Sequence, residues 1–446
     1  MSASVAVGAS ERVVSARELL MLAVPSSLFV LLTNGYRVVD QYFVQGVSVA
    51  AQAAVGSSIF VLLVAFAGAE LIACGVGPLV ARATGAGDED LRRKVIGTGI
   101  IAAAFASLIV GAAGVLGAEA IARWLGLEGE TARECARYLS ALSWTLLPLY
   151  LTPVLDYAYL AMGNARTPLI LHAISLVSNI ILTPIFIFDL GWGVPGAALA
   201  ANATRGIATA IGLYGLLEAT HSKPRDLRLE PLLVPRILRI GAPMAVGTVA
   251  YALVYWALLE TTISPLGPSV NAGLGVGFSA LEGVTWPCYH GVGLATASYV
   301  GRYLGAGRPD LARAVVYKAL PMTTMLGIIA TLAFGLGGSF LTGLFTSDPL
   351  VHMEATRYAV VLAWSQILVS WESLEEGVLA GAGATRAVFW GSMPFNVARV
   401  PLAYFLAFNA GWGAAGVWWA INVTTLAKVI AKGWVTVRGQ WVRIVI

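Results

Sequence analysis

Charged residues are scarce in this sequence of 446 residues, where Asp, Glu, Lys and Arg together make up only 12%. A soluble globular protein carries roughly 25% of such residues, and it needs them to cover a surface that faces water. Hydrophobic residues make up 58% of the chain, and the mean hydropathy is +0.78. This composition excludes a large soluble protein and indicates a polytopic membrane protein, in which lipid surrounds the fold.

Cysteine and histidine are also rare. The three cysteines lack a CxxC spacing, so neither a disulfide framework nor a thiolate metal site is indicated, and the four histidines are too scattered to suggest a metal cluster. The net charge of +4 comes from basic residues that lie between apolar runs rather than along one face, so no nucleic-acid partner is expected. At the N-terminus the small residues precede the first apolar run, so a cleaved signal peptide is not expected. No cofactor is expected either.

Long apolar runs divide the chain into predicted membrane spans. Lipid offers the backbone no hydrogen bonds, so a span has to be a helix of about 20 residues or part of a closed barrel, and the runs are too long for barrel strands. We predict an all-α protein with twelve transmembrane helices, at residues 18–45, 53–81, 95–118, 136–162, 167–189, 193–217, 237–264, 270–301, 314–344, 353–383, 387–408 and 412–434.

The distribution of Lys and Arg predicts how these helices are oriented. The two tails and the loops after even-numbered helices hold 21 of the 28 basic residues, when a charge at a helix end is counted with its loop. The loops after odd-numbered helices hold four, and Arg37, Arg205 and Arg399 fall inside spans. Because basic loops stay on the cytoplasmic side, we expect a multi-pass protein of the cell membrane with both termini in the cytoplasm.

An internal repeat divides the chain into two halves. Residues 80–95 match residues 300–315 at nine of sixteen positions, and the matches include charged residues. Since each half has six helices, both enter the membrane from the same side, so the lobes are parallel repeats related by a pseudo-twofold axis along the membrane normal. The predicted lobes are residues 1–217 and 237–446, joined by a charged, proline-containing cytoplasmic linker at 218–236.

Short segments distributed over the whole chain resemble one known family, the multidrug and toxic compound extrusion (MATE) transporters. These segments are Pro25, Asp40–Val44, Arg82 with Gly85–Gly87, Asn179 ahead of Gly193–Leu199, Gly305–Gly307 and Gly416–Trp419. The resemblance implies two six-helix lobes around a central cleft that alternates in exposure. It also implies export of cationic or amphipathic compounds in exchange for protons or sodium ions.

The first lobe contains the strongest single candidate for ion coupling. An ionisable group inside a span is costly and is a functional hypothesis by default, and Asp40 matches an aspartate of the family in the first helix. Tyr36 lies one turn earlier on the same face, and Asn179 matches a polar residue of the family's site. Thr183 stands where related proteins often carry an aspartate, which favours a proton over sodium. Alternatively, Arg37 and Asp40 form a structural ion pair.

The second lobe contributes more acids, and the candidates there are Glu260, Glu282, Glu372 and Glu376. The two repeats are offset by 220 positions, and this offset makes Glu260 the equivalent of Asp40 and Glu376 the equivalent of Asp156. The anchor prolines give an offset that is shorter by two positions, so the equivalence is uncertain by that amount. Glu375 and Glu376 follow Glu372 by three and four positions, so Glu372 shares a helix face better with either of them than Glu375 and Glu376 share one with each other. Family members carry essential acids in these helices, but displaced from these positions by about one turn.

Together these features predict a cation-coupled antiporter, a monomer in the lipid bilayer that exports organic cations or amphipathic compounds by alternating access. A buried carboxyl group that binds either a proton or a cationic substrate, but not both, is the minimal chemistry for such exchange. The alternative is a flippase for a lipid or a lipid-linked oligosaccharide with the same architecture. A membrane-embedded prenyl-transfer enzyme is not expected, because the chain has no DDxxD motif.

Overall fold

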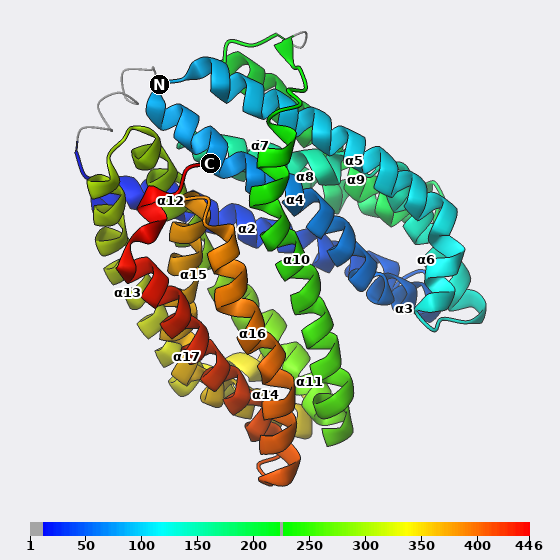
Figure 1. Cartoon of the computed structure of the whole chain (residues 1–446). Helices are drawn as coiled ribbons and strands as arrows, with labels where there is room; N and C mark the ends of the chain where they lie inside the picture. Colours follow the sequence, from blue (N-terminus) through cyan, green and yellow to red (C-terminus); the bar gives the residue numbers. More distant parts are fainter. Residues whose placement is uncertain (1–11, 224–225) are drawn as a thin grey trace. The chain divides into compact units, whose positions relative to one another are not determined.

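The computed structural model describes residues 12–223 and 226–446, and every regular element in these residues is a helix or a helical turn (Figure 1). Each of the twelve predicted spans falls on one helix or on consecutive helical segments, which confirms the predicted all-α fold. The side chains of Asn34, Arg37, Val38, Ile59, Phe60 and Ala280 lie outside the described part of the structure.

Contacts along the chain define two compact units. The N-terminal unit is Phe29–Ala245, and the C-terminal unit combines the described part of Met1–Leu28 with Val246–Ile446. Two helices, α2 (Ala16–Val44) and α10 (Val234–Leu258), therefore contribute to both units. The predicted lobe limits at 217 and 237 follow the order of the chain and stay a prediction.

The helices of the N-terminal unit, besides its parts of α2 and α10, follow one another along the chain. They are α3 (Val49–Ser57), α4 (Ile59–Ala86), α5 (Glu89–Trp124), α6 (Gly129–Trp144), α7 (Leu147–Ala161), α8 (Arg166–Pro184), the π-helical turn η1 (Ile185–Asp189) and α9 (Val194–Ala219).

The C-terminal unit contains more interruptions by π-helical and 3₁₀ turns. Its segments are η3 (Leu259–Ile263), η4 (Ser264–Leu266), α11 (Pro268–Val276), η5 (Gly277–Glu282), α12 (Gly283–Gly305), α13 (Pro309–Gly343), α14 (Pro349–Leu362), η6 (Ala363–Ser365), α15 (Gln366–Gly381), α16 (Thr385–Tyr404), η7 (Phe405–Asn409), α17 (Ala414–Arg438) and η8 (Gln440–Arg443).

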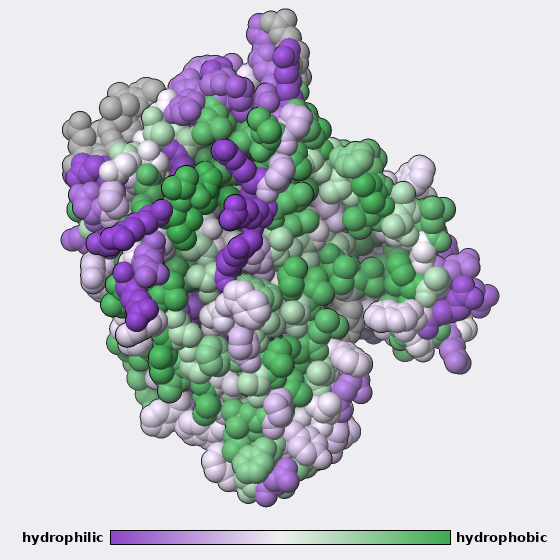
Figure 2. Space-filling model, in the orientation of Figure 1, coloured by the Kyte–Doolittle hydropathy of each residue, from purple (hydrophilic) through white to green (hydrophobic). Residues whose placement is uncertain are grey.

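Among the described residues, seven helical segments are long and apolar enough to cross a membrane, and the pair α6 and α7, bent by 53°, makes an eighth if it forms one span. Large apolar side chains are exposed along these segments; Leu116 on α5 is 88% exposed and Leu332 on α13 is 52% exposed. Apolar residues also cover much of the face shown in Figure 2. Such surfaces require lipid around them, so the chain is a multi-pass membrane protein.

The internal repeat extends to details of the backbone. Gly87 and Gly307, which are equivalent in the repeat, both have φ of +69° and lie just beyond the ends of α4 and α12. This left-handed conformation is common after a helix, and glycine adopts it without steric cost. The π-helical turns η1 and η7 also begin at equivalent positions, Ile185 and Phe405. The two halves of the sequence therefore share local structure well beyond the matched blocks.

Part of the predicted linker packs on α5. The backbone N–H of Glu230 donates a hydrogen bond to Thr98 Oγ1 at 3.1 Å. A Cβ atom added to Gly97 would lie 3.2 Å from the carbonyl oxygen of Arg228, so the linker backbone runs directly over this glycine. The described residues 226–233 are thus held against the N-terminal unit before α10 begins.

Small residues bring α12 and α15 close together in the C-terminal unit. A Cβ atom added to Gly293 would lie 2.6 Å from the carbonyl oxygen of Ser373, and one added to Gly377 would overlap the backbone carbonyl group of Gly293. In membrane proteins such contacts contribute van der Waals packing that larger side chains would prevent. This close approach holds α15, which carries Glu372 and Glu376, against its neighbour.

We predict that Gly377→Ala destabilises the protein by about 1–3 kcal/mol, because the new methyl group meets backbone that cannot rotate away. The matched control is Gly275→Ala on α11, where an added Cβ meets no heavy atom within 4 Å. Alanine is the better helix former, so the control should match or exceed the parent in melting temperature. Thermal unfolding of the purified protein tests both, and equal stability of the two variants would contradict the packing argument.

Candidate functional site

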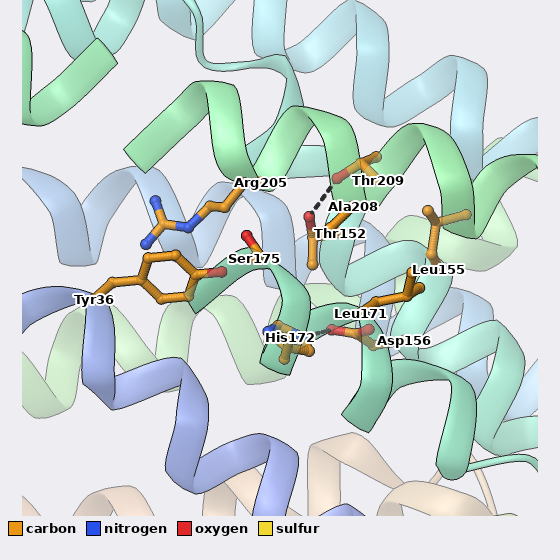
Figure 3. Close-up of a pocket in the computed structure, with 10 residues that line it drawn as sticks. All are labelled: Tyr36, Thr152, Leu155, Asp156, Leu171, His172, Ser175, Arg205, Ala208 and Thr209. Carbon is orange, nitrogen blue, oxygen red and sulfur yellow. Dashed lines mark hydrogen bonds and ion pairs between the residues drawn. The ribbon is translucent and has the colours of Figure 1, made fainter. Parts of the chain in front are cut away.

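A small cavity lies inside the N-terminal unit, among α2, α7, α8 and α9 (Figure 3). The volume open to the centre of a water molecule is about 20 Å³. Since one ordered water needs roughly 10–15 Å³ of such volume, the cavity can hold a water. Its lining is Tyr36, Thr152, Leu155, Asp156, Leu171, His172, Ser175, Arg205, Ala208 and Thr209. Seven of these residues carry a polar group, so a water or a small polar group in the cavity could find hydrogen-bond partners.

Two interactions between helices organise this cavity. His172 Nε2 on α8 lies 2.9 Å from Asp156 Oδ2 on α7, with both side chains buried. The imidazole ring also stacks on Phe29, with ring centroids 5.5 Å apart. The guanidinium carbon of Arg205 lies 4.2 Å from the ring centroid of Tyr36, and Figure 3 shows the two side chains facing one another. An arginine over a tyrosine ring is stabilised by a cation–π interaction.

Some hydrogen-bonding capacity in the cavity is unused. The hydroxyl groups of Tyr36 and Ser175 are buried close to each other and to Arg205, but neither makes a hydrogen bond of full geometry with the described residues. Leaving a buried hydroxyl unpaired costs about 1–3 kcal/mol, whereas a water or a polar ligand group in the cavity would satisfy both. Tyr36, a predicted site residue, therefore lines a polar cavity.

Asp40 and Asn179 lie one turn beyond these two cavity residues on the same helices. Asp40 follows Tyr36 by four positions on α2, and Asn179 follows Ser175 by four positions on α8. Asp40 is 7% exposed, and its Oδ1 atom has no hydrogen-bond partner among the described side chains, which do not include that of Arg37. The amide of Asn179 donates to Thr183 Oγ1 at 3.0 Å, which leaves its Oδ1 atom without a partner.

The alternative that Asp40 forms an ion pair with Arg37 concerns a side chain outside the described residues. The basic group described near Asp40 is instead Arg205, whose charge acts on the carboxyl group. Among its described side chains, the N-terminal unit thus combines the buried acid Asp40, whose Oδ1 atom has no partner there, with the nearby guanidinium of Arg205 and a cavity one turn away.

The C-terminal unit holds a different arrangement, a buried network of acids and lysines. Lys432 Nζ on α17 donates to Glu372 Oε1 at 2.8 Å, to Glu376 Oε1 at 2.7 Å and to Ser392 Oγ at 2.9 Å. Lys428 Nζ, one turn earlier on α17, lies 2.8 Å from the same Glu372 oxygen. The predicted common face of Glu372 and Glu376 is therefore confirmed, and both acids are ion-paired.

The other two predicted acids lie outside this network. Glu282 is half-buried at the end of η5, where the charges of Arg399 and Lys428 act on it. Arg399 donates through Nε to Thr424 Oγ1 at 3.0 Å. Glu260 is exposed. Leu258, which is the repeat equivalent of Asp40 when the offset of the anchor prolines is used, is fully buried. Residues two apart on a helix point about 200° apart, so the uncertainty in the offset decides which residue occupies the buried face.

Lys428 and Lys432 are site residues that the sequence pattern does not single out. They lie inside the predicted span 412–434, near its end, where a charge is counted with the C-terminal tail. Their four-residue spacing, which matches that of Glu372 and Glu376, was the available signal. Without these two lysines the count of basic residues on the predicted cytoplasmic side is 19, so the expected orientation of the termini still follows from the asymmetry.

Metal chemistry has no support in this part of the molecule. Over residues 12–223 and 226–446, no group of three or more His, Cys, Asp or Glu side chains could hold a metal ion. The structure instead combines apolar membrane-crossing helices, two repeated units and buried charged groups in both. These features are typical of a polytopic membrane transporter.

Comparison with known proteins specifies the family. The family model described as MatE matches residues 25–185 and 243–405, more than half of the chain. The chain therefore belongs to the MatE family, the MATE transporters that its sequence resembles.

Relatives and solved structures match over nearly the whole chain. The chain is 25% identical over 440 residues to the probable multidrug resistance protein NorM of Thermotoga maritima, covering 95% of this chain and 93% of that protein. It is 27% identical over 434 residues to the multidrug resistance protein MdtK of Pectobacterium atrosepticum, covering 93% of each. A MOP superfamily transporter from Pyrococcus furiosus superposes with a TM-score of 0.87 at 19% identity, covering 96% of this chain and 97% of that one.

We predict that His172→Phe lowers stability by about 1–3 kcal/mol, because it leaves the buried carboxyl group of Asp156 without its imidazole partner. The ring stacking on Phe29 is kept. The matched control is His290→Phe, since His290 also stacks on an aromatic ring, that of Trp286 at 4.6 Å, and makes no hydrogen bond with the described residues. Thermal unfolding should show the larger loss for His172→Phe; equal losses would argue against a stabilising His172–Asp156 interaction.

Proposed function

We propose that this MATE transporter is a proton-coupled antiporter that exports cationic or amphipathic organic compounds by alternating access. The observation that carries the proposal is Asp40, a buried carboxyl group with one unpartnered oxygen inside a membrane-crossing helix. Such a group binds a proton or a cation, and exchange between the two couples the opposing fluxes. The names of the relatives, multidrug resistance proteins, support organic compounds as the cargo.

Tyr36 and Asn179 complete the proposed site. In the predicted topology helices 1 and 5 run in the same direction, so Asp40 and Asn179, each one turn beyond a cavity residue, lie at a similar depth. The oxygen atoms of Asp40 and Asn179 accept hydrogen bonds, and the ring of Tyr36 offers an aromatic surface next to the cavity. We infer that cargo or proton-carrying water reaches Asp40 through this polar region.

The scarcity of oxygen ligands favours a proton over sodium. A sodium ion prefers several hard oxygen ligands, and here Thr183 replaces the aspartate that related proteins often carry. The amide group of Asn179 donates to the Thr183 hydroxyl oxygen at 3.0 Å, so this hydroxyl is already engaged. One carboxylate and one free amide oxygen make a weak sodium site but a sufficient proton site.

The C-terminal acids have a different role in this proposal from the one their sequence suggests. Glu372 and Glu376 are bonded to lysine ammonium groups, so they present no free carboxylate to a cationic cargo. Glu282 remains a candidate for cargo binding because it is not part of this network. Glu260 is exposed, so it remains a candidate for binding cargo at the surface of the C-terminal unit but not in its buried core. The transporter acts as a monomer with both termini in the cytoplasm.

A flippase for a lipid or lipid-linked oligosaccharide is the second candidate. The three buried basic residues Arg399, Lys428 and Lys432 favour it, because phosphate-bearing cargo needs cationic partners. The Pyrococcus furiosus neighbour is described as having a binding pocket of reverse polarity that suggests a different function. Two of these three basic residues, Lys428 and Lys432, are already paired with glutamates. Of the three, this leaves Arg399 to bind a phosphate group, which argues against the flippase.

The proposed function predicts that proteoliposomes containing the purified protein export a fluorescent lipophilic cation when a pH gradient is imposed. A sodium gradient at equal pH should not drive export. Asp40→Asn should reduce export to the level of empty liposomes, since asparagine cannot take up and release the proton. The matched control is Asp189→Asn, an exposed aspartate at the end of η1, which should transport like the parent.

The outcomes separate the candidates. Export driven by sodium alone would replace the proton as coupling ion, and full activity of Asp40→Asn would move the coupling site elsewhere. No export under either gradient, together with scrambling of a labelled anionic lipid in the same vesicles, would favour the flippase.

A further inference from the structure

The ammonium group of Lys432 sits in a cage of oxygen atoms. Its three hydrogen-bond partners are Glu372 Oε1, Glu376 Oε1 and Ser392 Oγ, at 2.7–2.9 Å, and the lysine side chain is 0% exposed. An ammonium group has three N–H donors, so these three acceptors use its full hydrogen-bonding capacity. Two carboxylates and a hydroxyl around one positive charge are the surroundings that a bound monovalent cation would have.

The N-terminal unit shows what the same place looks like without a lysine. At the offset that relates position 80 to position 300, the counterparts of Glu372, Glu376, Ser392 and Lys432 are, in that order, Thr152, Asp156, His172 and Gly212. The first three counterparts line the polar cavity of the N-terminal unit. A Cβ atom added to Gly212 would meet Leu171 and Leu155, which also line it. In the N-terminal unit the counterpart of Lys432 therefore carries no side chain, and two leucine side chains that line the cavity pack at that position.

The charges of the network are balanced. Glu372 Oε1 lies 2.8 Å from the ammonium groups of both Lys428 and Lys432, and Glu376 is bonded to Lys432. Two carboxylates and two ammonium groups balance one another within these ion pairs, and one further acid, Glu375, and one further base, Arg399, act on the network from outside them. Removing Lys432 alone would leave one uncompensated carboxylate, and the Glu376 side chain is 35% exposed, so an ion could reach it.

We propose that Lys432 is a tethered cation that fills a monovalent-cation site formed by Glu372, Glu376 and Ser392. The lysine thereby excludes sodium, potassium and cationic cargo from this site in the C-terminal unit. That Lys432 occupies this site does not depend on whether the protein transports anything. Its consequence is that ion coupling depends on the N-terminal unit, and this consequence rests on the function proposed above.

Cation-dependent thermal stability of the full-length protein in detergent tests this proposal. All variants carry Asp40→Asn, so that the N-terminal acid contributes nothing. The melting temperature is measured at pH 8 while NaCl or KCl replaces N-methylglucamine chloride at constant ionic strength. Lys432→Met keeps the side-chain stem, which packs against Gly391, and removes the ammonium group. The matched control is Lys318→Met, an exposed lysine on α13.

With Lys432 present, the melting temperature should not depend on which cation is supplied. Lys432→Met should be less stable in N-methylglucamine, and sodium or potassium should restore a saturable increase of about 2 °C or more, because a ligand that binds only the folded state stabilises it. Adding Glu376→Gln to Lys432→Met removes the uncompensated charge and should abolish the response. Lys318→Met should behave like its parent.

A folded Lys432→Met protein that does not respond to sodium or potassium would overturn the proposal. If Lys432→Met does not fold, the variants that retain Lys432 still decide the question. A saturable sodium response of Asp40→Asn that Glu376→Gln abolishes would show that external cations enter the cage despite the lysine. Neither measurement requires transport, so a failure here is distinguishable from a failure of the proposed antiport.

Discussion

Charge buried among membrane-embedded helices has to be paired or neutralised, because an isolated charge there costs several kcal/mol. The two units of this transporter meet that requirement in different ways. In the C-terminal unit, Lys428 and Lys432 neutralise Glu372 and Glu376 through direct ion pairs. In the N-terminal unit Asp40 keeps an oxygen atom without a partner, and this incomplete pairing is what suits a group to exchange a proton.

Similar backbones carry this different chemistry. Left-handed glycines and π-helical turns recur at equivalent positions of the repeat, so the two units place equivalent residues in comparable local surroundings. Where the N-terminal unit has Gly212 beside a polar cavity, the C-terminal unit has the side chain of Lys432. The two repeats differ at all four positions, those of Lys432 and its three hydrogen-bond partners: the residues of the N-terminal unit lie at a cavity with room for a water, whereas the acids of the C-terminal unit are bonded to lysine.

The sequence predicted the helical fold, the twelve spans and the repeat, since length, hydropathy and glycine position are local properties. It also singled out Asp40, because a charged residue in an apolar run is visible without any structure. It did not reveal that Glu372 and Glu376 are neutralised. Lys428 and Lys432 lie near the end of the last span and were counted with the tail, and their pairing with α15 depends on packing between helices that are far apart in the sequence.

Glu260 is a second residue whose surroundings the sequence could not predict. An offset uncertain by two positions turns a helical side chain through about 200°, so alignment within the repeat could not decide between an exposed glutamate and the buried Leu258. The sequence by itself determined which segments cross the membrane and which carry charge, because each follows from the residues of one helix. Only the tertiary structure decided which charges are free and which are paired, because the partner of a buried charge lies on a different helix.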